Sequence, residues 1–330
     1  MNVRKKQYYP AHVRWRHRAE YLIFRSAACL IGMLSARQTA ALARTMAFVI
    51  FRLLPRRLTR YKVAQENIRA AFGKTYNDKQ IDVIIHRMWV HLFRMIGEIL
   101  QLSRKMRRYN CFDLLGFRDR EMAVQALASE RPVIVLSGHF GNWEMSIAAF
   151  GLFGFPMSVV ARPLDNPYLD DWFGEFRRYT GHSMIAKRGA YNRMAAVLKR
   201  GGNVALLADQ DAGLKGVFVD FFGKPASTFP TIARLAIEHD AYICVGYAFR
   251  VADRFDDYRW SRFEMGSTGV VDPRDYTGPD RVRDISQAFT NAVETAVRRA
   301  PEQYFWVHRR WKTKPEQAIG FEELQTRKAG

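Results

Sequence analysis

The spacing of apolar residues predicts helices in the first third of the chain. Between residues 78 and 103, apolar side chains recur every three or four positions, from Ile81 and Ile84 to Ile99 and Leu100. That spacing puts them on one broad face of a helix, and Asp78 is suited to cap its N-terminus. A similar pattern predicts a helix over residues 57–72. Residues 57–110 are therefore expected to form a helical lead-in to the rest of the chain.

From about residue 110 the pattern changes to short apolar runs separated by helical segments. We expect strands over 132–137, 157–161, 203–208, 241–249 and 258–264. Between and after them, a periodicity of three to four residues predicts helices over 118–129, 143–152, 166–180, 190–200, 228–239 and 281–300. Strands that alternate with helices are typical of an α/β fold. The expected architecture is a mixed, largely parallel sheet flanked by helices.

Two apolar stretches could concern a membrane. One is the 17-residue uncharged run 145–161, which Gly151, Gly154 and Pro156 interrupt. We expect a helix and a strand of the buried core there. The other covers residues 21–54, where arginines limit the longest uncharged run to the 11 residues 26–36. That run is shorter than the roughly 20 residues that cross a bilayer.

An apolar helix with interspersed arginines suits the membrane interface. Its apolar face can enter the acyl region while its arginines meet lipid phosphates. A helical pair packed on the body with solvated arginines, and a single tilted span, are the alternatives. We expect residues 1–56 to form basic, hydrophobic, membrane-associating helices and residues 57–330 to form an α/β domain.

The net charge of +20 is concentrated near the N-terminus. Residues 1–62 hold 14 Lys and Arg against 1 acidic residue, whereas residues 111–300 hold 23 of each sign. Such a basic segment attracts a polyanion: nucleic acid, an anionic membrane, an acidic protein or a phosphorylated substrate. The balanced body has no nucleic-acid-binding signature, which argues against nucleic acid. Three widely spaced cysteines argue against a disulfide framework and favour a reducing compartment.

One loop combines groups that suit acid–base chemistry. His139 follows the strand expected at 132–137, and open α/β sheets bind ligands at the carboxyl ends of their strands. Asn142 can cap the helix that follows. Glu144 falls in the first turn of that helix, where it can accept a hydrogen bond from one imidazole nitrogen and leave the other as a base. No second histidine stands nearby at a metal-ligand spacing, so no metal is expected.

A histidine followed after four residues by an acid resembles the signature of the glycerolipid and lipid A acyltransferases. The form found here, Ser137-Gly-His-Phe-Gly-Asn-Trp-Glu144, is similar to that of the late acyltransferases of lipid A biosynthesis, the lauroyl and myristoyl transferases. Further segments resemble the same family in order, namely 160–167, 208–211, 221–236 and 301–313. The resemblance implies a glycerolipid-acyltransferase-like fold.

The resemblance also implies an enzyme that moves a fatty acyl chain from acyl carrier protein to a hydroxyl of a lipid A precursor. The place implied is the cytoplasmic face of the bacterial inner membrane, and no cofactor is implied. An alcohol is a weak nucleophile, so His139 is the expected general base, oriented by Glu144. Arg162, just after a strand, is the candidate that stabilises the oxyanion or the substrate.

Six further polar residues are candidates for substrate binding. They are Asn142, Asp209, Gln210, Arg309, Arg310 and Lys312. The last three suit a substrate phosphate, although a solvated basic tail is the alternative, and Asp209 could simply end a strand. The expected partners are acyl carrier protein, a phosphorylated glycolipid acceptor and an anionic membrane surface. All three are acidic, so one basic surface could attract them all.

Two other functions stay open from the sequence. A lysophospholipid or glycolipid O-acyltransferase could use the same His139 and Glu144 dyad with a different acceptor. A non-catalytic basic protein could bind nucleic acid or membrane, and it would keep its function without His139. Loss of activity on replacement of His139 therefore separates the enzymes from the binding protein.

Overall fold

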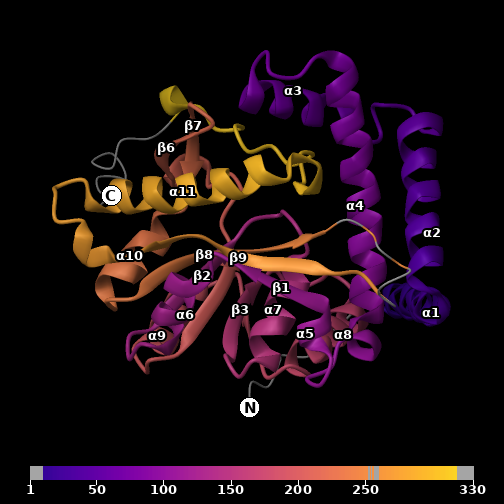
Figure 1. The fold of residues 1–330 in the computed structure, drawn as a ribbon, viewed down its shortest axis with the longest axis horizontal. Coiled ribbons are helices and arrows are strands. Elements are labelled where there is room, and N and C mark those ends of the chain that lie inside the picture. The colour runs from indigo at the N-terminus through magenta and orange to yellow at the C-terminus, as the bar shows by residue number, and fades with distance from the viewer. Residues whose placement is uncertain (1–9, 252, 254, 256–259, 318–330) are drawn as a thin grey trace.

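The computed structural model describes residues 10–251, 253, 255 and 260–317. Its centre is a seven-stranded sheet in the order β1-β9-β8-β2-β5-β3-β4 (Figure 1). β8 and β9 pair antiparallel, and the other neighbours in this sheet pair parallel. The strands of the sheet are β1 (Leu115–Arg118), β2 (Val133–Ser137), β3 (Met157–Ala161), β4 (Ser183–Ala186), β5 (Asn203–Leu207), β8 (Tyr242–Arg250) and β9 (Phe263–Val271). A separate antiparallel hairpin consists of β6 (Val217–Phe221) and β7 (Lys224–Thr228).

Helices cover both faces of the sheet, which confirms the expected α/β fold. Figure 1 shows α11 above the sheet and α7 and α8 below it. The α-helices are α1 (Ala11–Met33), α2 (Ala36–Phe48), α3 (Tyr61–Phe72), α4 (Asp78–Lys105), α5 (Cys111–Leu114), α6 (Glu121–Ala128), α7 (Trp143–Leu152), α8 (Pro167–Arg178), α9 (Ala190–Leu198), α10 (Pro230–Glu238) and α11 (Arg281–Arg299). A π-helix follows α2 (Val49–Leu53), and single 3-10 turns occur at Gly213–Lys215, Pro273–Asp275, Pro301–Gln303 and Pro315–Gln317.

Alternate residues of β2 face two separate cores. Ile134 and Leu136 belong to the large cluster that includes side chains of α4, α9, α10 and α11. Val133 and Val135 belong to a cluster on the opposite face, together with side chains of α6. Successive side chains of a strand point to opposite faces, and a parallel strand is normally covered on both. This double burial fixes the register of the strand whose end carries His139.

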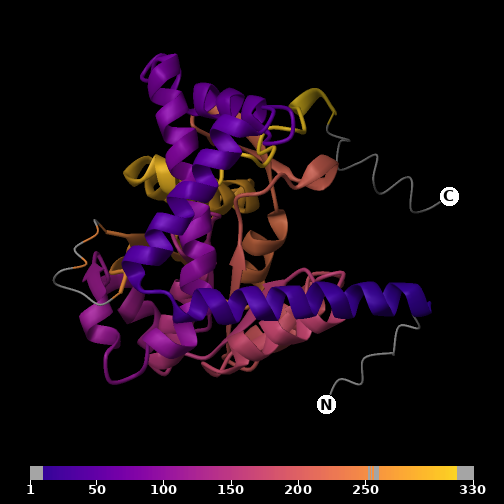
Figure 2. The ribbon, with the colours of Figure 1, turned by 90° about the vertical axis from the view of Figure 1, so that its right-hand side faces the viewer.

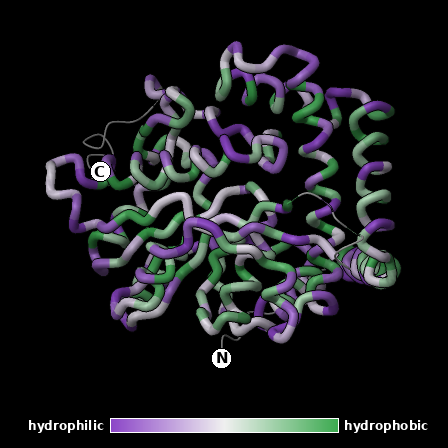
Figure 3. Tube along the Cα trace, viewed as in Figure 1, coloured by the Kyte–Doolittle hydropathy of each residue, from purple (hydrophilic) through white to green (hydrophobic). Residues whose placement is uncertain are grey.

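The long helix α4 confirms the predicted helix and extends it by one half-turn to Lys105. Hydrophobic and hydrophilic positions alternate along it (Figure 3). Its N-cap is Asn77 rather than the expected Asp78, because Asn77 Oδ1 accepts from the backbone N–H of Gln80 at 3.0 Å. Gln80 Oε1 accepts in return from the Asn77 N–H, which completes a capping box. The preceding helix α3 begins at Tyr61 rather than at residue 57.

α2 packs closely along α4 (Figure 1). A Cβ atom on Gly97 of α4 would lie 2.5 Å from Thr39 Cγ2, so the glycine permits this approach. One turn further along α4, the Gln101 side-chain amide donates to the carbonyl oxygens of Ile31 and Leu34 at 2.8 and 3.0 Å. It also lies 3.0 Å from Thr39 Oγ1. These contacts attach α4 to the turn between α1 and α2.

α1 lies along α8 with one side and leaves apolar residues exposed elsewhere (Figure 2). Phe24 contacts Trp172 of α8 with ring centroids 5.0 Å apart, and Asn166 Nδ2 donates to the His17 carbonyl oxygen at 2.9 Å. Large exposed apolar residues of α1 are Trp15, Leu22, Ile23, Leu30 and Met33. Within the described chain, no helix has both the length and the apolar composition of a membrane span. Membrane association of residues 1–56, and the division of the chain at residue 56, stay predictions.

The apolar run 145–161 divides as expected, since α7 ends at Leu152 and β3 begins at Met157. The remaining differences from the sequence-based expectations concern strands. The strand expected over 258–264 instead runs from Phe263 to Val271, and residues 258–259 lie outside the described residues. The sequence pattern did not predict β1, β4, β6 or β7.

Candidate active site

His139 stands in the loop between β2 and α7, and it is held there by Asp209. His139 Nδ1 lies 2.8 Å from Asp209 Oδ1, and the His139 backbone N–H donates to Asp209 Oδ2, also at 2.8 Å. Asp209 follows β5, which pairs parallel with β2, so the two residues meet at the carboxyl edge of the sheet. A carboxylate only accepts, so Nδ1 carries the proton in this pair and Nε2 is left as the base.

The Asp209 carboxylate is ionised although it is buried. Burial opposes its charge, but the neighbouring His139 imidazole and its hydrogen bonds outweigh burial and hold the pKa of Asp209 well below its usual range. Burial likewise opposes the charged form of His139. The charge of Asp209 and the hydrogen bond to it more than compensate, so the pKa of His139 is raised above its ordinary value. Lys187 acts in the opposite direction on His139.

Glu144 does not occupy the position that the sequence suggested. Its two carboxylate oxygens accept from Arg177 of α8, at 2.5 Å from Nη2 and 3.0 Å from Nε. Both side chains are largely buried. The carboxylate that orients His139 is therefore that of Asp209, 70 residues away along the chain, rather than the one in the first turn of α7. Glu144 still lines the same cavity as His139, and a catalytic role for it stays a prediction.

A cavity of about 600 Å³ opens beside His139. Most of its wall is apolar and comes from β2, β3, β5, α7, α9 and the start of α10. Phe150 and Met157 line one part of it, and Met194 and Ile232 line another. Its polar and charged wall residues include Ser137, His139, Glu144, Arg162, Arg177, Lys187 and Gln210. A hydrocarbon chain suits such a cavity, and His139 is one of the polar groups in its wall.

Arg162 follows β3 and lies at the exposed side of this cavity. Its side chain is 78% exposed and pairs with Asp165 at 3.3 Å. An exposed ion pair of this kind is weak, so the guanidinium can exchange Asp165 for a substrate group. The expected contact between Arg162 and an oxyanion or substrate stays a prediction.

Two of the expected substrate-binding residues have partners inside the protein. Asn142 is 1% exposed; its Oδ1 caps α7 at Met145 N, and its Nδ2 donates to Glu98. Arg310 is 2% exposed and donates to the Ser227 carbonyl oxygen and to Thr228 Oγ1, each at 2.6 Å. These contacts give both side chains a structural role, which corrects the expectation that they face the substrate.

The other candidates divide between the cavity and the surface. Gln210, the residue after Asp209, lines the cavity. Arg309 and Lys312 are exposed in the segment 301–313. Binding of a substrate phosphate by these two residues stays a prediction.

Sequence reasoning missed Arg177, Lys187 and His308 as neighbours of the site. His308 packs near His139 with ring centroids 6.0 Å apart, and its Nε2 lies 3.1 Å from both the Tyr304 hydroxyl and the Asp209 carbonyl oxygen. Burial lowers its pKa. His308 stands in the last segment that resembled the acyltransferases, which was the only signal available for it.

Comparison with known proteins identifies relatives that are acyltransferases of lipid A biosynthesis. A family model described as "Bacterial lipid A biosynthesis acyltransferase" matches residues 12–313. The chain is 26% identical over 267 residues to the lipid A biosynthesis palmitoleoyltransferase of Escherichia coli (strain K12), covering 78% of this chain and 80% of that protein. It is 28% identical over 191 residues to the lipid A biosynthesis lauroyltransferase of the same organism, covering 57% and 59%.

A second kind of relative acts on a different lipid. The chain is 26% identical over 195 residues to the phosphatidylinositol mannoside acyltransferase of Mycolicibacterium smegmatis (strain ATCC 700084 / mc(2)155). That similarity covers 56% of this chain and 59% of the relative. The relatives therefore share the transfer of acyl groups, while the lipids in their names differ.

Proposed function

The chain belongs to the bacterial lipid A biosynthesis acyltransferase family and is an acyltransferase, and from this premise we propose that it acylates a hydroxyl of a lipid A precursor. The proposed donor is a fatty acyl thioester of acyl carrier protein. The observation that carries the mechanism is the bond from Asp209 to His139, a residue that lines a mostly apolar cavity. The cavity suits the fatty chain, and the imidazole supplies the base that an alcohol nucleophile needs.

In the proposed reaction, His139 Nε2 removes the proton of the acceptor hydroxyl as its oxygen attacks the thioester carbonyl carbon. A carbon–oxygen bond forms, and the carbonyl oxygen becomes an oxyanion. Throughout the reaction, Asp209 accepts a hydrogen bond from Nδ1–H of His139, and it stabilises the imidazolium that forms. The carbon–sulfur bond then breaks, and the leaving thiolate receives the proton from the imidazolium. No acyl-enzyme intermediate is required.

Cationic groups beside the cavity supply the positive charge that the oxyanion needs. Arg162 keeps this role in the proposal, because its ion pair with Asp165 is exposed and weak and can give way to a substrate group. Lys187 also lines the cavity and acts electrostatically on His139. In this scheme Glu144 pairs with Arg177 instead of His139, and the two side chains together form part of the cavity wall.

The proposed location is the cytoplasmic face of the inner membrane. α1 exposes large apolar side chains, and residues 1–62 carry 14 basic residues against 1 acidic residue. This combination suits insertion at the interface of an anionic leaflet. It also suits an acidic carrier protein and a phosphorylated acceptor, because all three partners are negatively charged.

A glycolipid O-acyltransferase with another acceptor is the second candidate, because some relatives are phosphatidylinositol mannoside acyltransferases. The two candidates predict the same chemistry at His139 and differ in the acceptor. Purified protein should be given acyl carrier protein loaded with a fatty acid, together with a lipid A precursor, a phosphatidylinositol mannoside or lysophosphatidic acid. Mass spectrometry of the products identifies the acceptor.

Replacing His139 with Ala tests the mechanism. We expect kcat to fall by about 10²–10⁴-fold, because the variant has no base for the acceptor hydroxyl. His12→Ala is the matched control, since His12 is exposed on α1, and it should keep the activity of the wild type. Equal activity of the His139→Ala variant and the wild type would remove the proposed base.

A further inference from the structure

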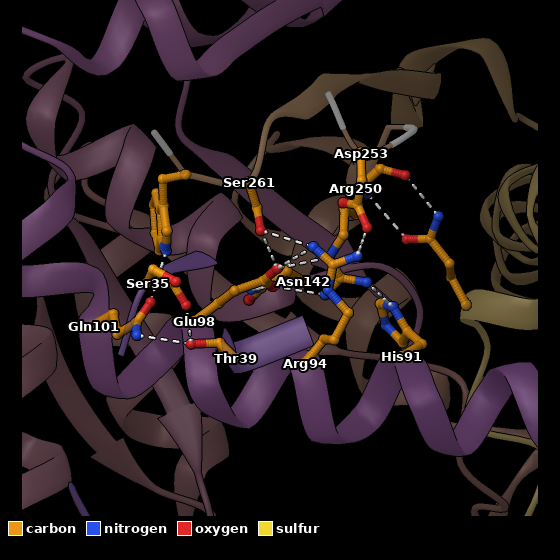
Figure 4. A network of polar contacts seen from close by, with 12 residues as sticks. Ser35, Thr39, His91, Arg94, Glu98, Gln101, Asn142, Arg250, Asp253 and Ser261 are labelled. Atoms are coloured by element: carbon orange, nitrogen blue, oxygen red, sulfur yellow. Dashed lines mark hydrogen bonds and ion pairs between the residues drawn. The ribbon is translucent and has the colours of Figure 1, made fainter. Parts of the chain in front are cut away.

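A largely buried ionic network reaches the loop that carries His139 through Asn142 (Figure 4). At its centre, Glu98 of α4 and Arg250 at the end of β8 form a two-bond ion pair. Arg250 Nε and Nη2 donate to the two oxygens of Glu98, each at 2.6 Å. Ser261 Oγ donates to Oε1 at 2.7 Å, and Asn142 Nδ2 donates to Oε2 at 3.0 Å. The Glu98 carboxylate thus joins α4 to the loop through Asn142.

His91, two turns earlier on α4, makes a second connection to the same loop. Its Nδ1 lies 2.8 Å from Arg250 Nη1, and its Nε2 lies 3.0 Å from the Gly141 carbonyl oxygen. A guanidinium only donates and a carbonyl only accepts. His91 therefore accepts at Nδ1 and donates at Nε2, which requires the neutral ring. Burial and the charge of Arg250 lower the pKa of His91 to about 3, in agreement with that tautomer.

The loop itself has little freedom at Gly141. This residue has φ +56°, and a Cβ atom there would lie 2.3 Å from the Ala248 carbonyl oxygen. The Gly141 N–H donates to the Gln303 carbonyl oxygen at 2.9 Å. The Gln303 side chain in turn accepts from the Arg250 N–H and donates to the Arg250 carbonyl oxygen. Arg250 is thus connected to the loop through His91, through Glu98 and through Gln303.

Burying Glu98, Arg94 and Arg250 costs free energy, even though ion pairs, one of them with the exposed Asp253, compensate their charges. Arg94 and Arg250 face Glu98 and Asp253, with Arg94 Nη1 2.5 Å from Asp253 Oδ2. A buried ion pair is often no more stabilising than apolar packing of the same volume, and a defined conformation is the better explanation for keeping it. In the loop after β2, this network holds Gly141 and Asn142.

We propose that His91, with Arg250 and Glu98 behind it, is a positioning residue that fixes the 138–142 loop and keeps His139 aligned with Asp209. This inference rests on the proposed function, in which His139 is the base. The neutral ring of His91 bonds on one side to Arg250 and on the other to the Gly141 carbonyl oxygen, two residues from His139. The position of Arg250 therefore fixes the position of that carbonyl group. Loss of this contact lets the loop shift and loosens the His139–Asp209 pair without changing a group that touches the substrate.

The test compares His91→Leu, His91→Gln and, as a matched control, His86→Leu. His86 lies on the same helix, but its ring packs on Phe51 at 5.5 Å. Steady-state kinetics over a range of pH are combined with NMR titration of the His139 ring in the full-length protein. We expect His91→Leu to lower kcat by about 10²-fold, since a misplacement of about 1 Å has such an effect, with KM nearly unchanged. The pKa of His139 should fall as its bond to Asp209 weakens.

The side-chain amide of His91→Gln can again donate to the Gly141 carbonyl oxygen, so this variant should recover most of kcat and most of the wild-type pKa of His139. His86→Leu should resemble the wild type in both. If His91→Leu does not fold, Arg250→Lys replaces it, because it keeps the charge beside Glu98 but loses the planar guanidinium that also reaches His91. A wild-type kcat and an unchanged His139 titration in the folded variant would overturn the inference.

The NMR measurement separates this inference from the proposed function. If the wild type transfers no acyl chain to any acceptor but the His139 titration still shifts in His91→Leu, the proposed function fails and the positioning role stands. If the wild type is active and His139→Ala is inactive while His91→Leu is normal in both measurements, the positioning role fails alone.

Discussion

The choice of carboxylate at His139 depends on strand order rather than on distance along the chain. Glu144 is five residues from His139, yet its oxygens accept from Arg177. Asp209 is 70 residues away and bonds to both the ring and the backbone of His139. The sequence predicted His139 and the edge of the sheet where it lies. It did not reveal that β5 is the neighbour of β2, so it could not assign the partner.

Asp209→Asn tests this assignment at the residue scale. The single amide oxygen can replace only one of the two carboxylate oxygens that bond to Nδ1 and to the backbone N–H of His139. The amide also carries no charge to stabilise the imidazolium, so we expect kcat to fall by about 10²-fold or more. A base must be unprotonated to act. In the wild type, the raised pKa of His139 therefore moves the acidic limb of the kcat/KM profile above the ordinary histidine value of about 6.5.

Without the Asp209 charge, burial and Lys187 both lower the pKa of His139, and the acidic limb of Asp209→Asn should move to lower pH. Apart from Asp209, Lys187 acts electrostatically on His139, and His139 in turn lowers the pKa of the neighbouring His308. Measurement of kcat/KM from pH 4 to 9 checks the direction. A limb that stays in place would show that Asp209 is not the carboxylate that sets the charge of His139, and Glu144→Gln is the matched comparison.

At the scale of elements, apolar periodicity predicted most of the longer buried elements and missed four strands of four or five residues, which are too short to show a pattern. α7 and β3 have the bounds that the sequence suggested, because their apolar residues face the core. β4 has four residues at the sheet edge, and β9 includes Gly266, Ser267 and Gly269. The β6–β7 hairpin turns at Phe222 and Gly223, both with positive φ. Phe-Gly lacks the Asn or Asp that usually indicates such a turn.

The contact between α2 and α4 gives a prediction at this scale. Gly97→Ala should lower the free energy of unfolding by about 1–3 kcal/mol through overpacking, because the new methyl group would meet Thr39 Cγ2. Thr39 cannot easily rotate away, since its Oγ1 donates to the Ser35 carbonyl oxygen. The double variant with Thr39→Ser keeps that hydroxyl, removes the methyl group and should recover most of the loss in denaturant titrations. A Gly97→Ala variant as stable as the wild type contradicts the close packing.

At the scale of the whole molecule, basic charge and exposed apolar residues occur together on the N-terminal helices. We expect a variant with Leu22→Ser, Ile23→Ser and Leu30→Ser to bind anionic vesicles at least about 10-fold more weakly, because each buried apolar side chain contributes on the order of 1.5–3 kcal/mol. Vesicle sedimentation measures this. High salt should weaken binding further by screening the arginines.

The control for this experiment changes apolar residues that are exposed on another helix. Met122 and Val124 of α6 are 59% and 47% exposed, and their replacement by Ser should leave vesicle binding unchanged. Equal loss in both variants would mean that general surface hydrophobicity, and not α1, determines binding.

The helix α4 connects the N-terminal helices α1 and α2 to the loop that carries His139. Within about three turns of α4, Gln101 bonds to the α1–α2 turn, Glu98 bonds to Asn142, and His91 bonds to Gly141. If α1 rests on a bilayer, α4 is a rigid connection that sets the distance and orientation of His139 relative to the lipid headgroups. An acceptor lipid would then need to rise only a fixed distance out of its leaflet to reach the base.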